Sequence, residues 1–299
     1  MSKPLYRFLL VSDMHYTTDI TADKMKNIDP TVKPSAAAGD AFGFTQREKI
    51  DKITEAVLSE HAASPLDAVL VLGDLSIDDY NYRNLPNYCR RFKEDCMDLL
   101  PCPSYAIPGN HDSHPDEVWQ EIFGYPREFT LKFGNTAFIM LDNFNSVPAA
   151  GASGAAYTPT NLEFLKKELA ALGNGKIILC AHHISEEKES EEFKRIVRED
   201  DRIIGMFRGH THLNKIIRSE TFGSKPLIDI GGYAYMGRKV GDRYDFSIFD
   251  ESWAWGYQTV EIFENKIRIR HVTPAILYHG SNGIFDIPCS ISDECEIEI

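Results

Sequence analysis

Five apolar segments of this chain are each followed directly by side chains of the kinds that bind metal ions. The segments are residues 6–12, 68–72, 105–108, 176–181 and 202–208. The groups that follow them are Asp13 with His15, Gly73-Asp74, Gly109-Asn110-His111-Asp112, His182-His183, and Gly209-His210-Thr211-His212. Ligand sites of open α/β sheets lie at the carboxyl ends of the strands. The pattern therefore predicts that these five groups meet in one site, where six of the ten histidines of the chain gather.

The rest of the chain alternates strand and helix patterns before it becomes rich in strands. Helical patterns cover 45–62, which opens with a capping box of Thr45 and Glu48, and 85–99, and another begins at Thr158-Pro159. A hairpin is predicted over 129–141, and strands over 226–230, 247–249, 256–263 and 266–272. This order predicts the α/β class, with two stacked sheets flanked by helices.

Neither an internal repeat nor a dividing linker interrupts the sequence, which predicts one domain over residues 1–299. Residues 16–44 hold prolines, glycine and a run of alanines with little periodicity, so we expect a lid or insertion there. Residues 143–157 are a second irregular stretch, rich in small side chains. A surface loop without a function is the alternative for both.

Composition restricts the partners of the chain. Hydrophobic residues make up 43% and charged residues 26%, the balance of a soluble globular protein. The formal net charge of -13 argues against a nucleic-acid partner, since such proteins carry a basic face. The densest basic stretch, Lys266, Arg268 and Arg270, alternates with apolar residues and is expected on the solvent side of a strand.

The sequence also predicts a cytoplasmic protein without membrane contact. The apolar run near the N-terminus is too short for a signal peptide, and no segment approaches the ~20 apolar residues of a membrane span. The six cysteines show no paired metal-binding spacing and are expected to be reduced thiols.

The residue types in the five groups select the metal. Imidazole nitrogen combined with carboxylate oxygen suits zinc, iron or manganese, whereas calcium and magnesium prefer oxygen ligands throughout. One carboxylate can bridge two cations, which two-metal hydrolases hold about 3.5–4 Å apart. Glycines 73, 109 and 209 are expected to allow the tight turns that bring the side chains together.

The order DxH, GD, GNHD, H, GHTH, from Asp13 to His212, resembles the calcineurin-like metallophosphoesterase superfamily. The resemblance implies a four-layer α/β/β/α sandwich of two mixed β-sheets. It also implies two metal sites, which share a bridging carboxylate. One would be held by Asp13, His15 and His212, the other by Asn110, His182 and His210, with Asp74 between them. His183 is the alternative to His182.

The resemblance gives His111 and Asp112 catalytic roles rather than metal-binding ones. His111 would stabilise a phosphoryl oxygen and protonate the departing oxygen, and Asp112 would orient His111. A simple turn residue is the alternative for Asp112. The remaining histidines, His61, His114, His271 and His279, are expected to be structural or exposed.

The implied reaction is hydrolysis of a phosphate ester by a metal-bridging hydroxide that attacks in line. Ile77 stands where purple acid phosphatases carry a metal-binding tyrosine, which argues against a purple site. Residues 141–160 loosely resemble the cyclic-nucleotide and glycerophosphodiester branches, which favours a small phosphodiester substrate. A small phosphomonoester ranks second and DNA third, and a scaffold without activity is the alternative class.

The sequence does not determine the oligomeric state. It also leaves two interpretations of the acidic tail 293–299, which is either a solvated end or an edge strand.

Overall fold

The computed structural model of the chain describes residues 3–16, 46–76, 88–146, 154–233, 238–240, 243–245, 255–280, 283–287 and 289–298. Two sheets and two short hairpins account for all the strands in these ranges. The hairpins are β10 (Arg238–Val240) with β11 (Arg243–Asp245), and β14 (Ile276–Gly280) with β15 (Gly283–Ile287). The expected lid at 16–44 and the strand at 247–249 fall outside the described residues, apart from Tyr16.

The first sheet has the strand order β16-β13-β12-β1-β2-β3. Its strands are β1 (Tyr6–Val11), β2 (Ala68–Leu72), β3 (Ser104–Ile107), β12 (Tyr257–Ile262), β13 (Lys266–Thr273) and β16 (Ser290–Glu298). β1, β2 and β3 are parallel, and the pairs β1–β12, β12–β13 and β13–β16 are antiparallel. The carboxyl ends of β1, β2 and β3 consequently share one edge of the sheet.

The second sheet has the strand order β4-β5-β6-β7-β9-β8. Its strands are β4 (Phe129–Phe133), β5 (Thr136–Leu141), β6 (Lys176–Ala181), β7 (Ile203–Arg208), β8 (Asn214–Arg218) and β9 (Pro226–Ile230). The four central strands are parallel, while β4 and β8 are antiparallel edge strands. Parallel pairing again places the ends of β6 and β7 side by side.

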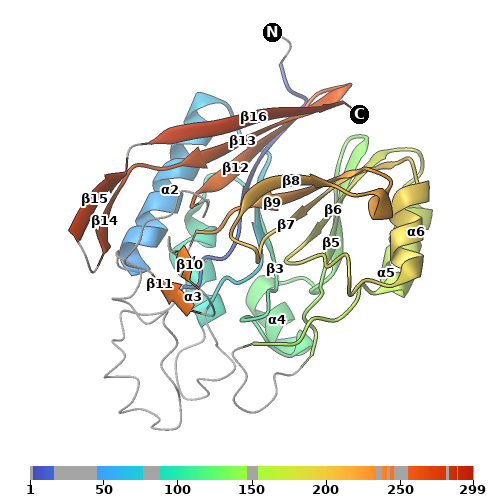
Figure 1. Ribbon diagram of the computed structural model, residues 1–299, viewed down its shortest axis with the longest axis horizontal. Helices are drawn as coiled ribbons and strands as arrows, with labels where there is room; N and C mark the ends of the chain where they lie inside the picture. The colour runs from blue at the N-terminus through green and yellow to red at the C-terminus, as the bar shows by residue number, and fades with distance from the viewer. Residues whose placement is uncertain are drawn as a thin grey trace.

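Three apolar clusters order the sheets and helices into four layers. The middle cluster lies between the sheets and takes Phe8 and Leu10 from β1 and Phe138 from β5. The helices that cover the outer face of the first sheet are α2 (Gln46–Ala63), α3 (Tyr88–Asp95) and α4 (Asp116–Phe123). Those on the second sheet are α5 (Leu162–Ala171) and α6 (Glu191–Glu199). Figure 1 shows the two helix layers on opposite sides of the paired sheets, so the predicted α/β/β/α sandwich is confirmed.

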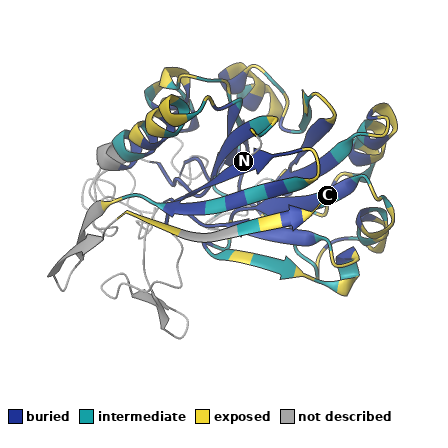
Figure 2. Ribbon diagram, turned by 90° about the horizontal axis from the view of Figure 1, so that it is seen from above, coloured by how far each residue is buried: buried dark blue, intermediate teal, exposed yellow. Residues whose placement is uncertain are grey.

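The apolar strands are continuous because both of their faces are covered. In β1, Phe8 and Leu10 enter the cluster between the sheets, whereas Leu9 and Val11 pack beneath the helices. A strand that is buried on both faces needs apolar residues at every position rather than at alternate ones. Figure 2 shows the result: buried strands lie inside, and the helices expose only their outer sides.

Most predicted elements are confirmed within one or two residues, but the start of one helix, which was expected at Thr158-Pro159, is wrong. Helix α5 begins later, at Leu162, and its N-cap is Asn161, whose side chain accepts a hydrogen bond from Phe164 N. Thr158 N instead donates to Asn143 O (2.7 Å), and Thr160 N and Oγ1 donate to Glu189. The polar groups of this segment are thus used in tertiary contacts before the helix starts. Thr45 and residues 85–87, which opened the other two predicted helices, lie outside the described residues.

Several elements were not predicted from the sequence, and the acidic tail is resolved in favour of the strand. Helices α4 and α6 and strand β8 were missed. β16 pairs with β13 at the edge of the first sheet, where Glu296 accepts hydrogen bonds from Lys266 and Arg268. The positive charges of the basic stripe on β13 are therefore neutralised locally by the neighbouring strand. Ile267 and Ile269, which alternate with the basic residues, point inward.

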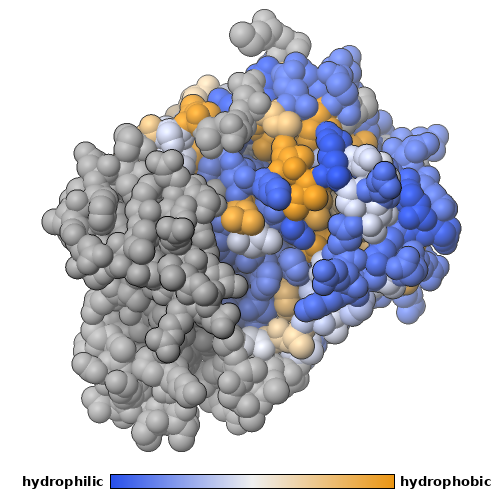
Figure 3. All heavy atoms as spheres, viewed as in Figure 1, coloured by the Kyte–Doolittle hydropathy of each residue, from blue (hydrophilic) through white to orange (hydrophobic). Residues whose placement is uncertain are grey.

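The surface is largely hydrophilic where it is described (Figure 3), and the cysteines are reduced, as the sequence predicts. Hydrophilic residues cover most of the described surface near α5 and α6, on the right of Figure 3. All six cysteines are free thiols, three of them buried. Among the described residues, no helix combines the length and apolar character of a membrane span.

We expect replacement of Asn161 by alanine to lower the free energy of unfolding by about 1 kcal/mol, since it removes the cap of α5. Chemical denaturation at equilibrium measures the change. Asn161→Ser keeps a capping oxygen but loses the contact between Asn161 Nδ2 and Glu128 (2.8 Å), so it should cost less. Equal losses in both variants would show that the Glu128 contact, and not the cap, stabilises this helix start.

Candidate active site

The turns after β1, β2 and β3 form a row along one edge of the first sheet. Asp13 N donates to Gly73 O (3.0 Å), and His15 N donates to Asp74 O (2.9 Å). His111 N, in the third turn, donates to Asp74 Oδ1 (2.9 Å). Hydrogen bonds thus continue past the ends of the strands and fix the three turns relative to one another.

The turns after β6 and β7 bring histidines from the second sheet to the same place. His210 N donates to Asp13 Oδ2 (2.9 Å), which connects the two sheets through their metal-binding turns. His182 is fully buried, and its Nδ1 lies 2.8 Å from Leu72 O. That contact leaves Nε2 of His182 directed at Asp74 Oδ2, 3.2 Å away.

The side chains gather into two clusters that could each hold a cation. In the first, atoms of Asp13, His15 and His212 lie within 4.8 Å of one another, and in the second those of Asp74, His182 and His210 do. Asp74 Oδ2 is also 3.7 Å from His15 Nε2, so this carboxylate faces both clusters. Six of the seven predicted ligands are therefore brought together, and Asp74 stands between the two groups.

Backbone strain is concentrated at these residues. Asp13, His15, Asp74, His210 and His212 have φ between 43° and 65°. Ser224 is the one further non-glycine residue with positive φ in the described ranges. Left-handed conformations are unfavourable for residues with a Cβ, and such strain collects at functional sites. Five ligand candidates thus share a conformation that, among the described non-glycine residues, only Ser224 also adopts.

The three glycines act in two different ways. Gly73 has φ of 86°, and a Cβ there would also lie 2.5 Å from His182 Nδ1. Gly109 and Gly209 are needed for space instead, because a Cβ would collide with Asp74 in one case and with Ser12 in the other. The expectation of tight turns at all three positions is thus too simple, since two of them provide close approach.

Asn110 provides a direct indication that a cation fits this site. Its Oδ1 is buried and accepts no hydrogen bond from the described residues. A buried amide oxygen without a donor is costly, and a metal ion would satisfy it. Together with imidazoles and carboxylates, this oxygen completes a donor set suited to manganese, iron or zinc.

The two adjacent histidines after β6 have different surroundings. His182 belongs to the second cluster, whereas the ring of His183 packs on His210 (centroids 4.6 Å apart) and on the edge of Tyr157 (5.5 Å). Burial and the neighbouring His210 lower the pKa of His183 to about 2. Within the described residues, His183 is outside both clusters.

Opposite charges at the site set the protonation of its members. Burial disfavours an ionised Asp74, but the charges of His182 and His111 outweigh it and hold the pKa of Asp74 well below its usual range. Burial likewise acts against a charged His182, yet Asp74 and Asp13 raise the pKa of His182 to about 9. A cation that binds here must displace the proton of His182, since imidazole binds metals in its neutral form.

His111 is partly exposed beside the clusters. Its side chain is 17% exposed, its ring is 4.9 Å from that of His15, and its Nε2 is 4.0 Å from Asp74 Oδ2. His15, Asp74 and His111 together form a third group of atoms close enough to hold a cation. Geometry alone thus permits either a ligand or an acid at this position.

Asp112 is fully buried beneath the row of turns. Its carboxylate accepts hydrogen bonds from the backbone amides of Gly109, Leu75 and Ser76, at 2.9–3.0 Å. The hydroxyl of Ser76 and the thiol of Cys89 also donate to Oδ1. Asp112 therefore connects the second turn to the turn that carries His111.

Sequence reasoning missed Phe144, which contacts the second cluster, and Glu189, which holds the Tyr157 ring that packs on Phe144. Phe144 is buried with its ring 5.5 Å from His182 and 5.7 Å from His210. Glu189 is buried and accepts hydrogen bonds from the Tyr157 hydroxyl (2.6 Å) and from Thr160. These contacts tie the segment after β5 to the loop after β6, across a sequence distance that no local pattern reveals.

Several solved structures align with nearly the whole of this chain. A solved dimetal phosphatase from Danio rerio aligns with a TM-score of 0.56 and 12% identity, over 97% of this chain and 99% of that chain. Vacuolar Protein Sorting 29 from Cryptosporidium parvum gives a TM-score of 0.40 and 12% identity over 98% of each chain. The phosphoesterase Yfce from E. coli gives 0.34 and 13%, over 94% of this chain and 98% of that one.

No curated protein matches the chain. The sequence model of the calcineurin-like phosphoesterases, however, matches residues 6–214, which is well over half of the chain and includes every residue of the two clusters. The chain belongs to the calcineurin-like phosphoesterase family.

Proposed function

We propose that this protein hydrolyses a small phosphodiester with two metal ions. Asp13, His15 and His212 hold one ion, Asn110, His182 and His210 hold the other, and Asp74 bridges them. The observation that carries the proposal is the position of Asp74 Oδ2, which is 3.7 Å from His15 Nε2 in one cluster and 3.2 Å from His182 Nε2 in the other. A carboxylate between two histidine-bearing clusters suits a dinuclear site of manganese, iron or zinc.

The residues around the ions provide the remaining functions. When bound, the cations activate a water for attack and neutralise the charge of the phosphate. His111 donates a hydrogen bond to the phosphoryl group and a proton to the departing oxygen, for which its partial exposure is suitable. Phe144 excludes water behind His182 and His210.

Asp112 acts on His111 through the backbone in this proposal. Its hydrogen bonds to Gly109 N and to the amides of Leu75 and Ser76 fix the turn from which His111 projects. The expected orienting role of Asp112 is thereby kept, although the contacts that support it run to the main chain.

A small substrate is favoured over a nucleic acid. The net charge of -13 repels a long polyanion, while a single phosphate is accommodated by the cations. The family and its implied dinuclear site leave monoesters and diesters open, and we prefer the diester. We also propose that residues 1–299 form a single domain, with the lid or insertion that the sequence predicts at 16–44.

The substrate class is tested by comparing bis(p-nitrophenyl) phosphate with p-nitrophenyl phosphate, on metal-stripped protein reloaded with manganese. We expect a clear preference for the diester in kcat/KM and no activity of the stripped protein with either compound. A preference for the monoester would make the protein a phosphatase with an unchanged site. If the protein binds two ions but hydrolyses neither compound, the alternative of a scaffold without activity would be favoured.

Replacement of His111 by glutamine is expected to lower kcat by about 10²–10⁴-fold while two manganese ions stay bound. If His111 protonates the leaving oxygen, the rate of the variant should depend more steeply on leaving-group pKa across a series of substituted phenyl esters. His114→Gln, in the same loop, is the control and should stay near the wild-type rate. Loss of one ion from the His111→Gln protein would instead make His111 a ligand.

The adjacent histidines after β6 give a matched pair of variants. We expect His182→Asn to bind one manganese ion fewer and to lose activity, because it removes a ligand of the second cluster. His183→Asn should bind two ions, since this ring packs outside the cluster. Metal content after gel filtration, measured by mass spectrometry, distinguishes them, and the reverse result would exchange their roles.

A further inference from the structure

A fully buried lysine contacts the backbone of the first metal-binding turn. Lys49 has no exposed surface, and its Nζ donates to Met14 O (2.7 Å) and to His15 O (3.1 Å). These two carbonyls belong to the turn whose side chains, Asp13 and His15, enter the first cluster. Lys49 itself lies in α2, far from that turn in sequence.

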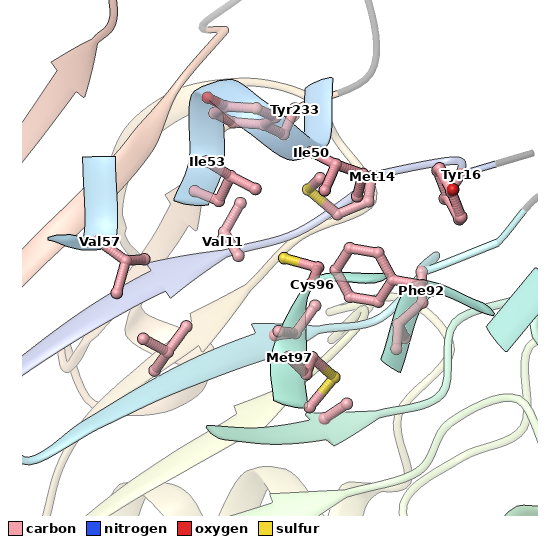
Figure 4. Packing of buried hydrophobic residues seen from close by; sticks show 14 of the residues in the cluster. Val11, Met14, Tyr16, Ile50, Ile53, Val57, Phe92, Cys96, Met97 and Tyr233 are labelled. Atoms are coloured by element: carbon pink, nitrogen blue, oxygen red, sulfur yellow. The ribbon is translucent and has the colours of Figure 1, made fainter. Parts of the chain in front are cut away.

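Helix packing explains how this side chain reaches the turn. Lys49, Ile53 and Val57 are spaced four residues apart and share one face of α2. Ile50, Ile53 and Val57 pack on Val11 and Met14 in the cluster under the helix, as Figure 4 shows. A lysine in this apolar layer is strongly unfavourable unless its ammonium group is hydrogen-bonded, and the two carbonyls meet that need.

The turn is thereby held from two directions. On one side its amides donate to the second turn, with Asp13 N bonded to Gly73 O and His15 N to Asp74 O. On the other side its carbonyls accept from Lys49. Between these supports, both Asp13 (φ 55°) and His15 (φ 43°) keep the left-handed conformation. Without the ammonium group, the carbonyls of 14 and 15 would be buried without these donors and the turn would relax.

We propose that Lys49 is a positioning residue that holds Asp13 and His15 in metal-binding geometry. The inference rests on the proposed two-metal function. It predicts a selective effect, because Lys49 contacts the turn of the first cluster, whereas the second cluster takes Asn110, His182 and His210 from other turns. Removal of the ammonium group should weaken the ion held by Asp13, His15 and His212 and leave the other ion in place.

The test compares manganese binding to metal-stripped wild type, Lys49→Met and Lys49→Arg by titration calorimetry. For Lys49→Met we expect one site weakened by about 10–100-fold, the usual cost of losing a residue that supports a metal ligand, and the other site unchanged. Lys49→Arg keeps the charge and the donors and should recover much of that affinity. Lys52→Met is the control, since Lys52 lies on the same helix but pairs with Glu55 near the surface.

Thermal unfolding in EDTA separates positioning from a purely structural role. If Lys49 only supports the fold, Lys49→Met lowers the melting temperature but binds two ions with wild-type affinity, and the proposal is overturned. Equal weakening of both sites overturns it as well. If Lys49→Met does not fold, Lys49→Gln replaces it in the comparison with Lys49→Arg, and equal manganese affinities in these two variants would contradict a role for the ammonium group. Failure of the two-metal function is distinct, since wild type itself would then bind no manganese pair.

Discussion

The backbone polar groups of the three turns after β1, β2 and β3 are the constraint on which the site depends. Inside a sheet these groups pair between strands, but past the strand ends each one needs another partner. Amides of the first turn donate to carbonyls of the second, at Asp13 to Gly73 and His15 to Asp74. Carbonyls of the first turn and amides of the second turn take other partners. Lys49 donates to the carbonyls of Met14 and His15, and Asp112 accepts from the amides of Leu75 and Ser76.

With its backbone fixed in this way, the row can hold groups that repel each other. Asp13 and Asp74 are both buried, and each carboxylate raises the free energy of the other in the ionised form. Imidazoles compensate for this repulsion between the carboxylates. His212 Nε2 lies 3.1 Å from Asp13 Oδ1, and His182 Nε2 lies 3.2 Å from Asp74 Oδ2. In the proposed two-metal site, the cations would take over this compensation from the imidazoles.

The parts of this structure that depend on local sequence could be predicted, and those that depend on long-range contacts could not. Runs such as 68–72 and 177–181 are apolar at every position because both faces of the strand are covered, so their bounds followed from the sequence. Asp13, Asp74 and His212 were found because strand ends converge. The start of α5 was misplaced because Thr160 is used by Glu189, which lies in a distant loop. Lys49 was overlooked, although its spacing to Ile53 and Val57 placed a charged residue on the buried face of a helix.

At the second sheet, a turn carbonyl also accepts a hydrogen bond from a buried cationic side chain, which here is an arginine. Arg208, the last residue of β7, precedes the turn of His210 and donates through Nη1 to Ile184 O, in the turn after β6. Its charge is balanced by Asp229 on β9, which is buried and 2.5 Å away. At each sheet, a buried cationic side chain thus contacts the backbone of a turn that carries predicted ligands: Lys49 of α2 at the first sheet and Arg208 of β7 at the second. Because an arginine paired with aspartate carries little net charge, it can stand beside a cation site at low electrostatic cost. Lys49 has carbonyl oxygens in place of a carboxylate, and their partial negative charges face its ammonium group.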